Sequence, residues 1–271
     1  MASFLAYPAY FLVAYVALTI ALYMLGFVVS KAAFVARLLA SVLCLIACAL
    51  YGAAASIILY PFGKAQISQW ATARAFKFVM TATTGLTFEV TDPKGILGST
   101  RPAVFLGNHQ SEMDVLMLGA MFPKYCSVAA KSSLRRTPFL GWFMILSGTI
   151  FIDRQNSKDA RAALSGAVKQ IRDKRQSVYM FPEGTRSYSK EPMLLPFKKG
   201  AFHLAVQAQV PIVPVVVANY SHVYFTKGGV FKPGKVPIKG RFFFFNRPRS
   251  LSSCLNPLPS PSWSPADREN K

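Results

Sequence analysis

Acidic residues are scarce in this chain and are absent from its first 88 residues. Only 11 of the 271 residues are Asp or Glu, against 31 Lys and Arg, which gives a formal net charge of +20. Residues 1–88 contain five basic residues and no acidic one, and the first carboxylate is Glu89. The chain is also 52% hydrophobic and only 15% charged. This composition excludes a disordered chain, and it predicts a membrane-attached N-terminal region followed by a basic domain that handles anions.

Motifs that would define a cofactor or metal site are missing as well. The chain contains neither G-x-x-x-x-G-K-[ST] nor G-x-G-x-x-G after an expected strand, so no nucleotide-binding loop is predicted. No cluster of Cys, His, Asp and Glu has the spacing of metal ligands, and no G-x-S-x-G elbow marks a serine hydrolase. The cysteines form no C-x-x-C pair and are interpreted as small apolar residues in a reducing compartment. We therefore expect no metal and no bound cofactor.

Two long uncharged runs lie in the N-terminal region. Residues 1–30 and 38–63 carry no charged side chain, and each run exceeds the ~20 residues that a helix needs to cross ~30 Å of hydrocarbon. The link between the two runs contains Lys31 and Arg37. We predict that residues 1–63 form a membrane hairpin of two hydrophobic helices. The sequence leaves open whether this hairpin spans the bilayer or dips into one leaflet.

Residues 64–85 combine apolar and cationic side chains. Trp70 and Phe78 are accompanied by Arg74 and Lys77, a composition typical of a helix that lies in the membrane interface. We interpret the segment as an interfacial amphipathic linker helix, and an ordinary core helix explains the same pattern equally well.

Short β-rich runs alternate with helical stretches in residues 86–240. This alternation predicts an α/β domain in which a sheet is flanked by helices. The expected strands are residues 86–91, 103–107, 125–129, 149–152, 177–182 and 211–217. The expected helices are near residues 111–121, 138–147, 157–175 and 198–208. Ligands in such sheets bind beyond the carboxyl ends of the strands, so the loops after the strands are the candidate site.

The loop after residues 103–107 leads into a helix and contains His109 and Asp114. A histidine just outside a helix and an aspartate in its first turn can face each other, and the carboxylate would then hold one imidazole N–H. The other ring nitrogen would be free to take a proton from a hydroxyl. From spacing alone, a structural histidine beside a helix-start carboxylate is an equally good interpretation.

The loop after residues 177–182 offers backbone N–H groups, a hydroxyl and a cation. Its residues are Glu183, Gly184, Thr185 and Arg186. A glycine directly after a strand lets the backbone approach a ligand closely, and N–H groups beside an arginine fork suit a phosphate. Taken alone, a tight turn with a surface arginine is the more common explanation of this pattern. Lys131 and Arg154, taken alone, are read as solvated cations or ion-pair partners.

Four blocks in this order resemble the glycerolipid acyltransferase family, and most closely its fungal membrane-bound 1-acyl-sn-glycerol-3-phosphate acyltransferases. The matching blocks are residues 108–114 (N-H-x-x-x-x-D), 148–154, 181–187 and 210–215. One block alone is weak, whereas four ordered blocks behind an apolar hairpin outweigh the structural interpretations of the single motifs. The resemblance extends to about Lys239 and is lost beyond it. Residues 241–271, which are rich in Pro and Ser, are expected to form a disordered tail.

The resemblance implies acyl transfer from acyl-CoA to the sn-2 hydroxyl of lysophosphatidate, with phosphatidate and CoA as products. It implies that His109 is the general base, that Asp114 orients it, and that the loop around Arg186 holds the phosphate. The substrate-binding residues expected on this basis are Glu183, Gly184, Thr185, Arg186, Arg154 and Lys131. The resemblance leaves open whether Glu183 holds its loop or contacts the glycerol. Acyl-CoA is a co-substrate and not a cofactor.

The expected partners are therefore lysophosphatidate, acyl-CoA and the lipid bilayer, with no nucleic acid. The fungal resemblance implies the endoplasmic reticulum membrane, with the catalytic domain on the cytosolic side. Two other functions stay open at this point. One is acyl transfer to glycerol 3-phosphate or another lysophospholipid, and the other is a non-catalytic membrane protein that binds anionic lipids.

Overall fold

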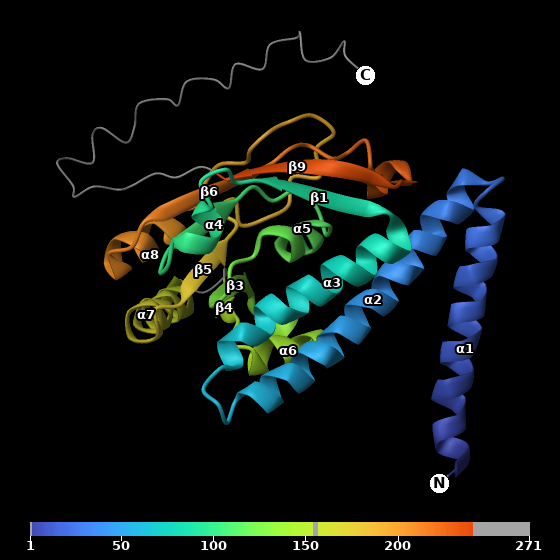
Figure 1. Cartoon of the computed structure of the whole chain (residues 1–271), viewed down its shortest axis with the longest axis horizontal. Helices are drawn as coiled ribbons and strands as arrows, with labels where there is room; N and C mark the ends of the chain where they lie inside the picture. The colour runs from blue at the N-terminus through green and yellow to red at the C-terminus, as the bar shows by residue number, and fades with distance from the viewer. Residues whose placement is uncertain (1, 154–156, 241–271) are drawn as a thin grey trace.

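A mixed β-sheet flanked by helices forms the centre of the computed structural model, which describes residues 2–153 and 157–240 (Figure 1). The seven strands lie in the order β1-β9-β6-β2-β5-β3-β4. Their bounds are β1 Leu86–Thr91, β2 Val104–Gly107, β3 Cys126–Lys131, β4 Ile150–Ile152, β5 Ser177–Met180, β6 Ile212–Val217 and β9 Gly234–Gly240. A small separate hairpin pairs β7 (Tyr224–Phe225) with β8 (Val230–Phe231). The predicted α/β fold is confirmed, and each of the predicted strands overlaps an observed one.

The helices account for most of the remaining described chain. Their bounds are α1 Ala2–Leu25, α2 Ser30–Leu59, α3 Ser68–Thr84, α4 Ile96–Ser99, α5 Asp114–Met121, α6 Leu140–Leu146, α7 Ser157–Lys174 and α8 Gly200–Ala208. Short 3-10 turns lie at η1 Ala65–Ile67, η2 Ser132–Arg136 and η3 Thr226–Gly228. Each of the four helices predicted after residue 86 has an observed counterpart, in α5, α6, α7 and α8.

Strand direction gathers the loops of the candidate site at one edge of the sheet. The strands β6, β2, β5, β3 and β4 pair in parallel, so their carboxyl ends share an edge. β9 runs antiparallel to β6 and parallel to β1. The loops after β2, β5 and β6 therefore lie together although they are far apart in the sequence.

β9 is the one strand of the seven-stranded sheet that was not expected from the sequence, and the two-residue strands β7 and β8 were not expected either. Its sequence contains two glycines, a proline and two lysines, and no run of apolar residues marks it. Only Val236 and Ile238 are fully buried, whereas Lys235 and Lys239 are exposed. A two-residue alternation this short carries too little signal to be separated from a loop.

Alternate side chains of the central strands point into two hydrophobic cores, one on each face of the sheet. Phe105 and Tyr179 belong to the core beneath α3 and α5. Val104 and Val178, their neighbours in the chain, belong to the core beneath α7 and α8. This alternation follows from the two-residue repeat of a strand, and it makes β2 and β5 a rigid base for the loops that follow them.

The two N-terminal helices, α1 and α2, are each long and apolar enough to cross a membrane. The turn between them occupies residues 26–29, earlier than expected, so Lys31 and Arg37 lie inside α2 and not in the link. Arg37 Nη1 donates to the carbonyl of Phe231 at 3.0 Å, which ties α2 to β8. α2 lies along α3, whereas α1 stands apart from the sheet (Figure 1).

α3 packs on its neighbours and leaves one large apolar side chain exposed. Phe76 and Met80 are buried in the core, whereas Phe78 is 77% exposed. Arg74, which the sequence analysis placed on an interfacial face, donates to the carbonyls of Gly119 and Ala120 at the end of α5. A cation at the carboxyl end of a helix stabilises the helix dipole, so α3 also supports the helix that carries Asp114.

Candidate active site

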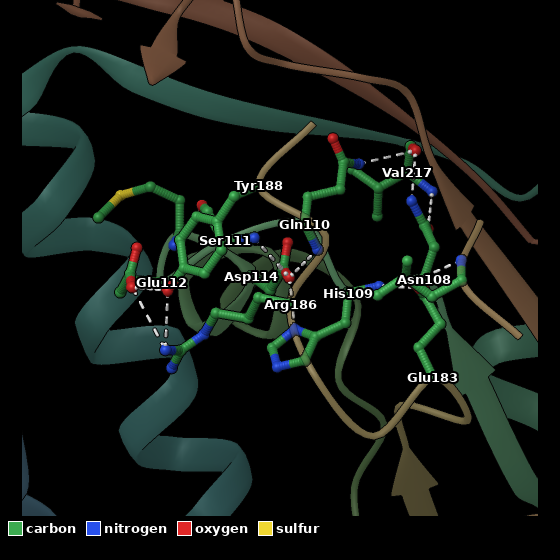
Figure 2. Close-up of polar contacts among 12 residues, drawn as sticks. Asn108, His109, Gln110, Ser111, Glu112, Asp114, Glu183, Arg186, Tyr188 and Val217 are labelled. Carbon is green, nitrogen blue, oxygen red and sulfur yellow. Dashed lines mark hydrogen bonds and ion pairs between the residues drawn. The ribbon is translucent and has the colours of Figure 1, made fainter. Parts of the chain in front are cut away.

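Two side chains of the β2–α5 segment meet at the carboxyl edge of the sheet. His109 follows β2, Asp114 begins α5, and Nδ1 of His109 lies 2.7 Å from Oδ2 of Asp114 (Figure 2). Oδ2 also accepts the backbone N–H groups of Gln110 at 2.7 Å and Ser111 at 3.2 Å. These bonds turn the chain back on itself, which is how residues five apart come to face each other. The side chain of His109 is 15% exposed, and Nε2 has no hydrogen-bond partner among the described residues.

The loop that carries His109 is fastened on both sides. The side chain of Asn108 donates to the carbonyl of Val217 at 3.0 Å and accepts the N–H of Val217 at 2.9 Å, which joins the loop to the end of β6. The ring of Phe181 stacks on His109 with centroids 4.0 Å apart. Gly107 precedes the loop, and a Cβ at this position would lie 1.7 Å from the hydroxyl oxygen of Tyr179. Glycine is therefore needed for β2 to lie this close to β5.

Glu183 links its own loop to two other backbone segments, because each of its carboxylate oxygens accepts a backbone N–H group. It is only 2% exposed. Its Oε1 accepts the N–H of His109 at 2.8 Å, and its Oε2 accepts the N–H of Leu195 at 3.0 Å. Of the two roles left open by the sequence, this geometry favours holding the loops over contact with a glycerol.

The rest of the Glu183–Arg186 loop is a tight turn pressed against the histidine loop. Gly184 is buried with φ +71°, in the left-handed region that favours glycine, and a Cβ there would lie 3.0 Å from Lys198 side-chain atoms. Thr185 is exposed. The N–H of Ser187 donates to the carbonyl of His109 at 3.0 Å, so the two loops are joined directly through their backbones.

Arg186 is already paired within the chain. Its Nη1 donates to Oε1 of Glu112 and to the hydroxyl of Tyr188, both at 3.2 Å, and the Tyr188 hydroxyl donates to the same Glu112 oxygen (Figure 2). Burial acts to lower the pKa of Arg186, but Tyr188 and Glu112 outweigh it, and the pKa is raised. The Nε atom of Arg186 has no partner among the described residues. Glu112 was not among the site residues expected from the sequence, because nothing in its spacing shows that it faces Arg186.

Tyr220 is a second residue that sequence reasoning missed. It lies in the loop after β6, and its hydroxyl donates to Oδ1 of Asp114 at 2.6 Å. Burial raises the pKa of Tyr220 well above its usual value, and the charge of Asp114 raises it further, so the phenol stays protonated. The two residues are 106 positions apart, and no local pattern links them.

The two remaining predicted residues are not brought to the pair by any described contact. Lys131 ends β3 with an exposed side chain, and β3 is separated from β2 by β5. Arg154 lies outside the described residues, as does the predicted tail, residues 241–271. Within residues 2–153 and 157–240, no group of three or more His, Cys, Asp and Glu side chains could hold a metal ion.

Known proteins resemble this chain in both sequence and fold. Residues 88–218 match the family model described as Acyltransferase. The 1-acyl-sn-glycerol-3-phosphate acyltransferase of Saccharomyces cerevisiae is 47% identical over 193 residues, which are 71% of this chain and 63% of the yeast protein. An uncharacterized acyltransferase of Schizosaccharomyces pombe is 44% identical over 189 residues, which are 70% of this chain and 67% of that protein.

The fold has a counterpart among crystal structures. The 1-acyl-sn-glycerophosphate (LPA) acyltransferase of Thermotoga maritima superimposes with a TM-score of 0.52 and 25% sequence identity, over 74% of this chain and 84% of that one. The chain thus spans somewhat under two thirds of the yeast relative's length, and the span includes the paired His109 and Asp114 and the loop that ends at Arg186. This chain belongs to the 1-acyl-sn-glycerol-3-phosphate acyltransferase family.

Proposed function

We propose that this protein transfers an acyl group from acyl-CoA to the sn-2 hydroxyl of 1-acyl-sn-glycerol 3-phosphate. The observation that carries the proposal is the 2.7 Å contact between His109 and Asp114, with the Nε2 atom of the histidine open at the same sheet edge as Arg186. A base for a hydroxyl beside a cation for a phosphate suits an acceptor that contains both groups. The name of the yeast relative supports the same substrate.

His109 acts as the general base in this reaction. Asp114 holds the proton on Nδ1, which leaves Nε2 as the acceptor for the proton of the sn-2 hydroxyl. As that proton leaves, the hydroxyl oxygen bonds to the thioester carbon and the carbon–sulfur bond breaks. The imidazolium then returns the proton to the departing thiolate, so phosphatidate and CoA leave with all atoms accounted for. A positioned base contributes about 10²–10⁴-fold to such a step.

The phosphate of the acceptor binds at the loop that contains Gly184, Thr185 and Arg186. The exposed part of the Arg186 guanidinium supplies the charge, and Lys131 and Arg154 are the further cations assigned to the phosphate in this proposal. Glu112 already occupies one nitrogen of Arg186. The incoming phosphate therefore shares the guanidinium with this carboxylate or displaces it.

Membrane attachment places the site beside its lipid substrates. In this proposal residues 1–63 form the bilayer hairpin, residues 64–85 lie at the interface, and residues 86–240 form the acyltransferase domain. The exposed apolar surface of α1 and the exposed Phe78 of α3 support attachment to a membrane. The membrane is that of the endoplasmic reticulum, and the domain faces the cytosol.

The proposal is tested by following a radiolabelled acyl group from acyl-CoA in membranes that contain the full chain. Lysophosphatidate, glycerol 3-phosphate and a lysophospholipid without a phosphate monoester are compared as acceptors. We expect lysophosphatidate to be labelled, and we expect His109→Ala to abolish turnover while the protein stays in the membrane. The matched control is His203→Ala, which removes an exposed histidine of α8. Equal turnover in the two variants would refute the mechanism, and labelling of another acceptor alone would refute the substrate.

A further inference from the structure

Tyr220 belongs to a hydrogen-bond chain that ends on the carboxylate of Asp114. Its hydroxyl lies 2.6 Å from Oδ1 of Asp114 and 2.7 Å from Oγ of Ser111. Oγ of Ser111 accepts the N–H of Met113 at 3.1 Å. Because a carboxylate can only accept, the tyrosine proton points to Asp114 and the serine proton points to the tyrosine oxygen. All hydrogen bonds of this series therefore run in one direction, toward Asp114, and each bond polarises the next.

The surroundings of this chain exclude water. Tyr220 is 1% exposed and Asp114 is fully buried. The ring of Phe88 meets the ring of Tyr220 edge-on, with centroids 5.8 Å apart. Because both side chains are buried, solvent does not compete for the hydrogen bond between the Tyr220 hydroxyl and Asp114.

The two oxygens of Asp114 have different partners. Oδ2 faces His109 and two backbone N–H groups. Among the described residues, the hydroxyl of Tyr220 is the one donor to Oδ1. A carboxylate that keeps its full charge for the imidazole favours the imidazolium, which cannot act as a base. A donor on Oδ1 withdraws part of that charge and also stops the carboxylate from rotating.

We propose that Tyr220 is a positioning residue which, through Asp114, holds the imidazole of His109 oriented and neutral so that it can accept the proton of the substrate hydroxyl. The inference rests on the proposed role of His109 as the base. In the part of the chain that the structure describes, the other ionisable groups that face this pair are Glu183, bonded to the N–H of His109, Arg186, whose charge acts on Asp114, and Tyr179. None of the three donates a hydrogen bond to Oδ1.

Tyr220→Phe removes only the hydroxyl, and Tyr179→Phe is its matched control. Tyr179 is also fully buried near Asp114, but its hydroxyl has no hydrogen-bond partner among the described residues. In the full chain we expect Tyr220→Phe to move the acid limb of the kcat/KM profile to higher pH by about one unit. The KM of each substrate at the pH optimum should stay unchanged, because Tyr220 is 1% exposed and has almost no surface that a substrate could contact. An acid limb that stays in place or moves to lower pH overturns the inference.

A second readout does not depend on turnover. The chain has three histidines, so the ring resonances of His109 are assigned by comparison with His109→Gln and titrated directly in the solubilised full chain. We expect the titration midpoint to move to higher pH in Tyr220→Phe and to stay in place in Tyr179→Phe. An unmoved midpoint in Tyr220→Phe overturns the inference.

The same titration separates the two proposals. If the wild-type chain transfers no acyl group but the midpoint moves, the proposed function fails and the link from Tyr220 to His109 stands. If the chain turns over but neither the midpoint nor the acid limb moves, only the inference about Tyr220 fails. Should Tyr220→Phe not fold, Ser111→Ala weakens the same chain at the tyrosine oxygen. It is expected to move the midpoint in the same direction by less, and no movement there overturns the inference.

Discussion

At the scale of single residues, the site combines groups that hold one another before any substrate arrives. The carboxylate oxygens of Glu183 and Asp114 accept hydrogen bonds from backbone and side-chain donors of the protein itself. Arg186 differs, because its partner Glu112 is a partly exposed carboxylate and not a buried one. A bound phosphate and Glu112 would carry charge of the same sign on the same guanidinium, so they oppose each other.

This opposition predicts the effect of Glu112→Gln on substrate binding. We expect the KM for lysophosphatidate to fall by about two- to fivefold, as for the loss of a competing exposed ion pair. Arg186→Ala should raise the same KM. Steady-state kinetics with varied acceptor at saturating acyl-CoA measure both changes, and Glu191→Gln, an exposed carboxylate, is the control. A higher KM for lysophosphatidate in Glu112→Gln would show that Glu112 assists binding.

At the scale of elements, close contacts between helices and strands depend on particular glycines. Gly52 lies in α2 where that helix crosses α6 and α3. A Cβ at Gly52 would lie 2.5 Å from ring atoms of Phe143 and 2.5 Å from Oγ1 of Thr72. Gly166 lies inside α7, and a Cβ there would meet nothing within 4 Å. The same substitution therefore has opposite consequences in the two helices.

Gly52→Ala should lower the free energy of unfolding by about 1–3 kcal/mol, because the added methyl group overpacks the helix contact. Gly166→Ala should raise it by about 0.5–1 kcal/mol, because alanine loses less backbone freedom in a helix interior. Thermal unfolding of the detergent-solubilised chain measures both. If Gly52→Ala proved as stable as Gly166→Ala, α2 would not pack on α6 and α3 as described.

The missed strand and the shifted helix turn also belong to this scale. The central strands were predictable because both of their faces are buried and their apolar residues run without a break. β9 was not predictable, since a strand with one buried face and two glycines has no such run. The turn at residues 26–29 was missed because the sequence places the link between the two apolar runs at the charged residues Lys31 and Arg37. In the structure α2 packs on the domain, and both residues lie inside this helix.

At the scale of the whole molecule, the two apolar helices have different roles. α1 is mostly exposed, and its described side-chain hydrogen bonds to the rest of the chain are those of Tyr15 to Leu39 and Tyr23 to Thr83. In α2, Cys44 and Cys48 belong to the main hydrophobic core. α1 therefore leaves exposed the apolar surface that the proposed membrane attachment would bury, whereas α2 is also a structural part of the domain.

Truncation separates these roles. Removal of residues 1–28 should leave a folded domain that is retained less strongly by membranes. Removal of residues 1–60 should expose the core beneath α3 and give aggregated or protease-sensitive protein. Vesicle flotation and limited proteolysis of the two truncated chains distinguish the outcomes, with the full chain as control. A protease-resistant product without residues 1–60 would contradict the packing role of α2.

The sequence by itself determined the apolar N-terminal region, the alternation of strands and helices and the short-range pairing of His109 with Asp114. These features depend on local composition and on residues a few positions apart, where spacing and strand period are informative. The tertiary structure alone decided that Glu183 binds the N–H of His109, that Glu112 occupies Arg186 and that Tyr220 donates to Asp114. Each of those contacts joins loops from different strands. These loops meet because five parallel strands end at one edge of the sheet. That arrangement depends on packing of the whole sheet and cannot be inferred from any single segment.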